Sequence, residues 1–108
     1  WGSGSPTREF LYIDDAAEGI LRAAERVRDA TPINLGSGRE VSIKSLAEMI
    51  ASAADYTGRI TWDSTKPDGQ PRRSLDVSRA AALLHWRAAM PLEEGLRRTV
   101  EWYRAREG

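Results

Sequence analysis

The sequence predicts a small α/β domain, α+β if the chain folds by itself, with three short strands and four helices. Its 108 residues suit one domain and are too few for two. Four segments carry apolar residues at helical spacing, and three short apolar stretches have the length of strands. The expected order is strand, helix, strand, helix, strand, loop, helix, helix. That order favours helices layered against a sheet, to which a longer parent protein would add further strands.

The first strand and helix are expected between residues 8 and 31. Phe10–Ile13 are consecutive and apolar or aromatic, as in a strand that is buried on both faces. Asp14 and Asp15, with Glu18 following, form an acidic variant of a capping box and predict a helix start. The helix should stop before Pro32. Its expected buried stripe consists of Ala17, Ile20, Leu21, Ala24 and Val27.

The middle of the chain predicts a second strand, a helix and a third strand. Ile33–Leu35 alternate around a polar residue and end at a Gly-Ser-Gly turn. Ser42 is expected to cap the second helix, which Gly58 closes. Ile60–Trp62 then place two apolar side chains on one strand face. The stripe expected on this helix is Ile43, Leu46, Ala47, Ile50 and Ala54.

Two further helices are expected near the end of the sequence. Asp76 is a suitable cap for a short helix through Leu84, and Pro91 suits the first turn of the last helix. The expected inward residues are Val77, Ala80, Leu83 and Leu84 on the first, and Leu92, Leu96, Thr99, Val100 and Tyr103 on the second.

Composition excludes several classes of function. The 16 basic and 16 acidic residues balance, so net charge gives no case for binding nucleic acid or an anionic membrane. Cysteine is absent, which excludes disulfides, thiol catalysis and cysteine-bound metal. No apolar run has the length of a membrane span, and no signal peptide is recognisable. A cytoplasmic protein fits these features.

No catalytic, metal or cofactor site can be assigned from the residues. Two glycine loops, Gly2 to Thr7 and Gly36 to Val41, resemble dinucleotide loops but lack the third glycine, so both are interpreted as turns. His85 is the single histidine and is interpreted as a helix-end residue. Asp14 and Asp15 are adjacent carboxylates, but a helix N-terminus accounts for them.

Binding chemistry is better represented. Lys66, Arg72 and Arg73 lie in a loop stiffened by proline and glycine, and Arg8 follows the first glycine loop. Arginine forks match phosphate oxygens, and a stiff loop loses little entropy on binding. Asp68 can accept hydrogen bonds from a sugar or base, and Trp1 can stack on either. The alternative is a solvated basic loop that pairs with carboxylates.

The chain resembles the carboxy-terminal part of the extended short-chain dehydrogenase/reductase family of NAD-dependent nucleotide-sugar epimerases and dehydratases. Three stretches carry the resemblance: "WGSGSPTREFLYIDDAAEGI", "INLGSGREVSIKSLAEMIA" and "KPDGQPRRSLDVSRAAALLHW" followed by "PLEEGL". The forms "WGSG", "REF" and "KPDG" are most similar to the GDP-L-fucose synthase subfamily.

The resemblance implies a substrate-binding role for residues 1–108, treated as a single domain, with a nucleoside-diphosphate sugar, GDP-linked by subfamily, as partner. It implies substrate contacts at Trp1, Arg8, Asp68 and Arg73, and at Lys66 with lower rank. NAD or NADP would be bound by an amino-terminal Rossmann domain outside these residues. The rival hypothesis is a stand-alone protein-interaction module in which the arginine loop meets acidic partners.

The family's catalytic residues are not found in this sequence. No tyrosine has lysine four residues later, and the glycine-rich cofactor loop is missing. The isolated chain is therefore expected not to catalyse, while its sheet edge near Ile33–Leu35 would favour self-association.

Overall fold

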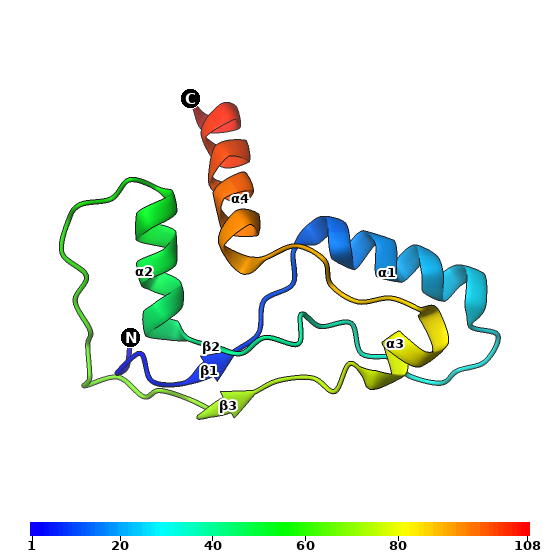
Figure 1. Cartoon of the computed structure of the whole chain (residues 1–108). Coiled ribbons are helices and arrows are strands. Elements are labelled where there is room, and N and C mark those ends of the chain that lie inside the picture. Colours follow the sequence, from blue (N-terminus) through cyan, green and yellow to red (C-terminus); the bar gives the residue numbers. More distant parts are fainter. The chain divides into compact units, whose positions relative to one another are not determined.

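The computed structural model describes residues 1–108, which form two compact units that alternate along the chain (Figure 1). Unit 1 is built from Trp1–Arg8, Val41–Arg73 and Pro91–Gly108, and unit 2 from Glu9–Glu40 and Ser74–Met90. Unit 1 holds β1 (Thr7–Arg8), β2 (Val41–Ser42), α2 (Ile43–Ala53), β3 (Arg72–Arg73) and α4 (Leu92–Glu107). Unit 2 holds α1 (Ile13–Arg26) and α3 (Ser78–Leu84). The prediction of three strands and four helices is confirmed.

The sheet of unit 1 has the order β2-β1-β3. β1 pairs antiparallel with β2 and parallel with β3. Each strand has only two residues, so each ladder is short. The central strand β1 therefore joins three segments that are distant in sequence: the amino terminus, residues 41–42 and residues 72–73.

Helices α2 and α4 pack together in unit 1 (Figure 1). Ser42 caps α2 as predicted, since its hydroxyl accepts a hydrogen bond of 3.0 Å from the Ser45 N–H. At the other end of α2, Arg104 of α4 donates to the Ala54 carbonyl at 2.5 Å and to the Asp55 carboxylate at 3.3 Å. A cation at a helix C-terminus complements the helix dipole, so this arginine links the two helices.

Unit 2 is built around Trp86, which is 2% exposed. Its indole Nε1 donates to the Asp15 carbonyl at 3.1 Å, and one Asp15 carboxylate oxygen accepts the Met90 N–H at 2.9 Å. Asp15 is thus a buried acid whose oxygens are used to hold the segment after α3 against α1. The core cluster is Ala80, Leu84 and Trp86, with Leu11, Ala23, Val27, Ile33, Leu35 and Ala88 packed against it.

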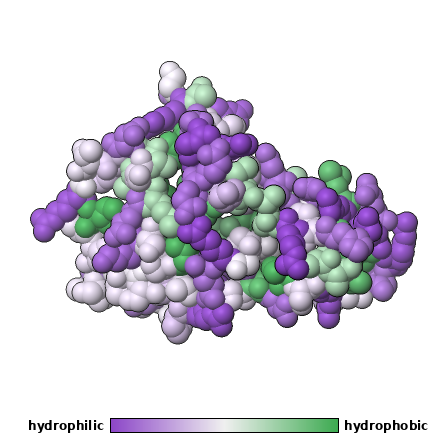
Figure 2. All heavy atoms as spheres, in the orientation of Figure 1, coloured by the Kyte–Doolittle hydropathy of each residue, from purple (hydrophilic) through white to green (hydrophobic).

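The predicted buried stripe of α1 is largely wrong. Asp15 and Gly19 face the core, whereas Ile13, Ile20 and Leu21 are 62–70% exposed. Ala17 and Ala24 are also exposed, and of the predicted stripe only Val27, just beyond the helix, packs on the core. Gly19 explains the choice of face, because its missing side chain lets Leu35 and Trp86 approach the helix closely. Figure 2 shows apolar atoms at the surface over α1.

The first predicted strand, expected to start at Arg8, overlaps β1 only at that residue, and the predicted positions of the other two strands are wrong. Phe10–Tyr12 run irregularly into α1, which begins at Ile13, and neither Ile33–Leu35 nor Ile60–Trp62 pairs with another strand. In unit 2 the Glu9 side chain joins two segments that are not paired as strands. Its carboxylate accepts hydrogen bonds from the N–H groups of Gly38 at 3.2 Å and Leu75 at 2.6 Å. The alternation of Ile33 and Leu35 was detected correctly, but both side chains serve the core without backbone pairing.

The predicted helix starts at acidic residues need correction. Tyr12 occupies the N-cap of α1 and no side chain caps the helix, so the Asp14–Asp15–Glu18 capping box is wrong. Asp76 lies one residue before the N-cap of α3, where its carboxylate accepts the Ser78 N–H at 2.9 Å. His85 ends α3 as expected, in a left-handed conformation with φ of 50°. None of the four helices has the length and apolar composition of a membrane span.

Candidate functional site

The parallel pairing of β1 with β3 places Arg8 and Arg73 opposite each other as Cα partners. Residues paired across adjacent strands project their side chains to the same face of a sheet. Arg8 is half-buried and donates to the Thr7 carbonyl at 2.7 Å, while Arg73 is exposed. Neither guanidinium has a carboxylate partner in the chain, so two positive charges share one sheet face.

Asp68 joins the basic loop to the amino terminus. Its carboxylate accepts the backbone N–H of Ser3 at 2.6 Å and the Ser3 hydroxyl at 2.8 Å. These two hydrogen bonds, the backbone one foremost, lower the pKa of Asp68 below its usual 3.8. Gly2 makes the approach possible, because a Cβ there would lie 2.3 Å from an Asp68 oxygen and its φ is 77°.

Trp1 and Lys66 contact each other, on the two chain segments that the Asp68 hydrogen bonds join. The Lys66 ammonium lies 5.5 Å from the centre of the Trp1 ring, within range of a cation–π contact. The Asp63 carbonyl accepts the N–H of Gly2 at 2.9 Å and that of Lys66 at 3.2 Å, so one backbone group orders both neighbours. Trp1 remains 82% exposed, and one face of its indole is available for stacking.

All five site residues proposed from the sequence lie in unit 1, on two chain segments. Trp1 and Arg8 come from the amino terminus, and Lys66, Asp68 and Arg73 come from the basic loop and the strand that ends it. Sequence reasoning missed Ser3, whose hydroxyl and N–H fix Asp68. The only local signal was a hydroxyl residue between two glycines. These residues include three cations and one aromatic ring. Such side chains suit a ligand that carries an oxyanion and a flat group able to stack.

Neither glycine loop fits the pyrophosphate of a dinucleotide cofactor, because a carboxylate lies against each. The Glu9 carboxylate binds Gly38 N–H, and its oxygens lie 2.8–3.0 Å from where a Gly36 Cβ would be. Asp68 occupies the equivalent place beside Gly2. Val41, in the position of the missing third glycine, is buried in β2. Neither of these two loops therefore leaves room for a pyrophosphate.

Comparison with known proteins gives a consistent relationship. The model of the NAD dependent epimerase/dehydratase family matches residues 1–36. "Probable GDP-L-fucose synthase 1" of Oryza sativa subsp. japonica is 43% identical over 103 residues, which are 95% of this chain and 31% of that protein. GDP-L-fucose synthase of Escherichia coli K12 is 39% identical over 112 residues, covering 95% and 35% respectively. The chain thus spans about a third of the length of these relatives.

Solved structures share the fold. UDP-glucose 4-epimerase of Thermotoga maritima, determined with UDP-glucose, has a TM-score of 0.91 at 28% identity, covering 100% of this chain and 35% of that one. GDP-L-fucose synthetase of Naegleria fowleri, bound to NADP, also has a TM-score of 0.91, at 31% identity, covering 98% and 34%. By sequence and by fold, the chain is similar to a part of the GDP-L-fucose synthases, and its first 36 residues match the NAD dependent epimerase/dehydratase family.

Proposed function

We propose that residues 1–108 bind the nucleoside-diphosphate end of a nucleotide sugar, with a GDP-sugar as the preferred ligand. The observation that carries the proposal is the cross-strand pair of Arg8 and Arg73, two cations without carboxylate partners on one sheet face. The names of these relatives indicate a GDP-linked sugar.

A diphosphate carries several negatively charged oxygens, and guanidinium groups bind such oxygens in pairs of hydrogen bonds. Arg8 and Arg73 come from different segments, so they can hold the diphosphate between them. Lys66 adds a third cation at the Trp1 ring, which is suited to stacking on the base or the sugar. The Asp68–Ser3 hydrogen bonds position the loop that carries these groups.

NAD or NADP would be held by polypeptide outside these residues. The cofactor would exchange hydride with the sugar. The part played by this chain is to orient the substrate, because contacts remote from the reacting carbon contribute to rate as well as to affinity. We also propose, from the amino-acid composition, that the parent enzyme is cytoplasmic. Cell fractionation would test this location.

Calorimetric titration with GDP tests the binding site. Arg8→Ala and Arg73→Ala should each weaken GDP binding by roughly 1.5–3 kcal/mol, the range for hydrogen bonds to charged groups. Arg59→Ala is the matched control, since Arg59 is an exposed cation of unit 1 outside the site. Arg22 is unsuitable as a control because it donates hydrogen bonds to Glu18 and to the His85 carbonyl.

Equal GDP affinity of the wild type, Arg8→Ala and Arg73→Ala, with folding intact, would refute the diphosphate site. Pyrophosphate and sulfate distinguish the rival hypothesis. A nucleotide-sugar site should bind GDP more tightly than either inorganic anion, whereas a basic loop for acidic partners should not discriminate between them.

The purified chain should show no epimerase or reductase turnover with a GDP-sugar and NADPH. The reason is the lack of a Tyr-x-x-x-Lys pair in the sequence and the carboxylates at both glycine loops. Measurement of NADPH oxidation by absorbance checks this. Turnover that co-purifies with the chain through several chromatographic steps would contradict it.

A further inference from the structure

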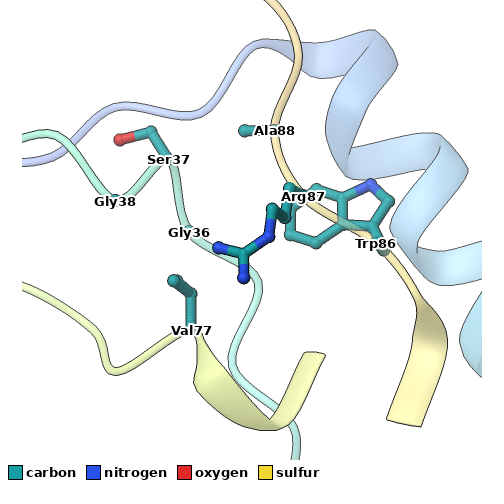
Figure 3. A pocket seen from close by; sticks show the side chains of 7 residues that line it. All are labelled: Gly36, Ser37, Gly38, Val77, Trp86, Arg87 and Ala88. Carbon is teal, nitrogen blue, oxygen red and sulfur yellow. The ribbon is translucent and has the colours of Figure 1, made fainter. Parts of the chain in front are cut away.

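Unit 2 contains a cavity of about 240 Å³ that is separate from the proposed nucleotide-sugar site. Its walls come from the glycine loop at Gly36 and Gly38, from Val77 before α3, and from Trp86, Arg87 and Ala88 after α3. Figure 3 shows the Arg87 guanidinium directed into the space between the glycine loop and Val77. Arg87 is exposed to solvent, and its guanidinium shares the cavity with the hydroxyl of Ser37 and with the apolar side chains of Val77, Trp86 and Ala88.

Arg87 forms no hydrogen bond or ion pair within the chain. It differs in this from Arg22, Arg79, Arg97 and Arg104, each of which bonds a carboxylate or a carbonyl. No acidic side chain lines the cavity. The guanidinium donors of Arg87 are thus available to an acceptor from outside the chain.

The walls are held in place by groups that do not compete for such a ligand. Glu9 binds Gly38 N–H on one wall and Leu75 N–H on the approach to the other, so both of its carboxylate oxygens are engaged. Gly36 accommodates this carboxylate, since any Cβ there would lie 2.8 Å from it. Trp86 is fixed by its indole hydrogen bond to the Asp15 carbonyl. The cavity is therefore a preformed feature of unit 2.

We propose that this cavity is a second binding site, for a small organic carboxylate with a short apolar group. The carboxylate would pair with the Arg87 guanidinium, whose planar fork matches a carboxylate with two parallel hydrogen bonds. The apolar group would contact Val77, Trp86 and Ala88. The volume lies below the roughly 300–1,000 Å³ of sites for drug-sized ligands, which limits the ligand to a few carbon atoms.

Butyrate is a suitable probe, titrated into the ¹⁵N-labelled chain while amide signals are followed by NMR. Saturable shifts are expected at residues 36–38 and 86–88. Arg87→Ala should weaken butyrate binding roughly tenfold or more, because the charge-assisted hydrogen bonds are lost. Arg28→Ala, which removes an exposed cation of the same unit outside the cavity, should leave binding unchanged.

Butylamine and inorganic phosphate complete the experiment. Butylamine has the same apolar group with the opposite charge and should not bind, and phosphate lacks the apolar group and should bind more weakly than butyrate. The proposal is overturned if butyrate causes no saturable shifts, if Arg87→Ala binds it as well as the wild type, or if butylamine or phosphate binds equally well. GDP titration of Arg87→Ala should match the wild type, which separates this site from that of Arg8 and Arg73.

Discussion

Gly19 lies where the core of unit 2 approaches α1 too closely for a side chain. A Cβ built there would lie 2.9 and 3.0 Å from the two terminal carbons of Leu35 and 3.2 Å from Trp86. Glycine within a helix costs about 1 kcal/mol relative to alanine. Packing offsets this cost, because the missing side chain lets Leu35 and Trp86 contact the helix surface.

Gly19→Ala should lower the free energy of unfolding by about 1 kcal/mol. Overpacking costs roughly 1–3 kcal/mol, against a gain in helix propensity of about 1 kcal/mol. Urea unfolding followed by circular dichroism measures the difference. In a Leu35→Ala background the new methyl group has space, so Gly19→Ala should there be neutral or stabilising. Ala24→Gly, on the exposed face of α1, gives the propensity term alone. Equal effects of Gly19→Ala in both backgrounds would contradict this account.

Residue roles set by near neighbours were predictable from the sequence, and those set by distant partners were not. Ser42 caps α2 through a bond to Ser45, three residues away, and the sequence predicted it. Asp15 has its partner at Met90, separated by 75 residues, so the sequence suggested only a helix-start role. Arg8 and Arg73 were proposed for one ligand through a family resemblance, and the β1–β3 register then placed them side by side.

At the scale of elements, helices were predicted well and strands poorly. A helix makes its backbone hydrogen bonds internally, so apolar periodicity located α2 and α4, and the Ser42 cap located the start of α2. A strand is defined by its partner, and the three two-residue strands here pair segments dozens of residues apart. Apolar runs such as Phe10–Ile13 instead join the α1 start and the core. The sequence therefore predicted the number of strands without their positions.

Helix α4 carries a charge network whose pH response can be predicted. Hydrogen bonds from Arg97 and then Arg98 lower the pKa of Glu94 from 4.5 to about 2. A lowered pKa in the folded state means that the unfolded state binds more protons between these values. The contribution of Glu94 is therefore complete above about pH 4.5 and is lost as the pH falls toward 2.

Glu94→Gln should thus reduce the acid sensitivity of α4 in this pH window, measured as helix content and thermal stability at successive pH values. Carboxyl NMR should show Glu94 titrating near pH 2. The effect should shrink in high salt, since these side chains are near the surface. Glu25→Gln, which removes an exposed carboxylate of α1 without an arginine partner, is the control. An ordinary pKa for Glu94 would show that the network does not persist in solution.

At the scale of the whole molecule, α1 leaves a group of large apolar side chains uncovered on one face. Ile13 is 70% exposed, Ile20 62% and Leu21 66%, and Ala17 and Ala24 extend the same face. The expected apolar surface at Ile33–Leu35 is instead packed on the core of unit 2. Apolar side chains at this spacing on one face of a helix favour contact with a second apolar face.

We therefore predict that the isolated chain self-associates through α1, with a second copy of the chain covering this face. Sedimentation velocity over a range of concentrations should show a reversible increase in mass for the wild type. The double variant Ile20→Gln and Leu21→Gln should remain monomeric at the same concentrations, because it removes the two largest neighbouring apolar groups of the face without touching Asp15 or Gly19. Leu83→Gln, at a 49% exposed position of α3, should self-associate like the wild type. A wild-type chain that stays monomeric throughout, or a double variant that associates equally, would rule out α1 as the contact.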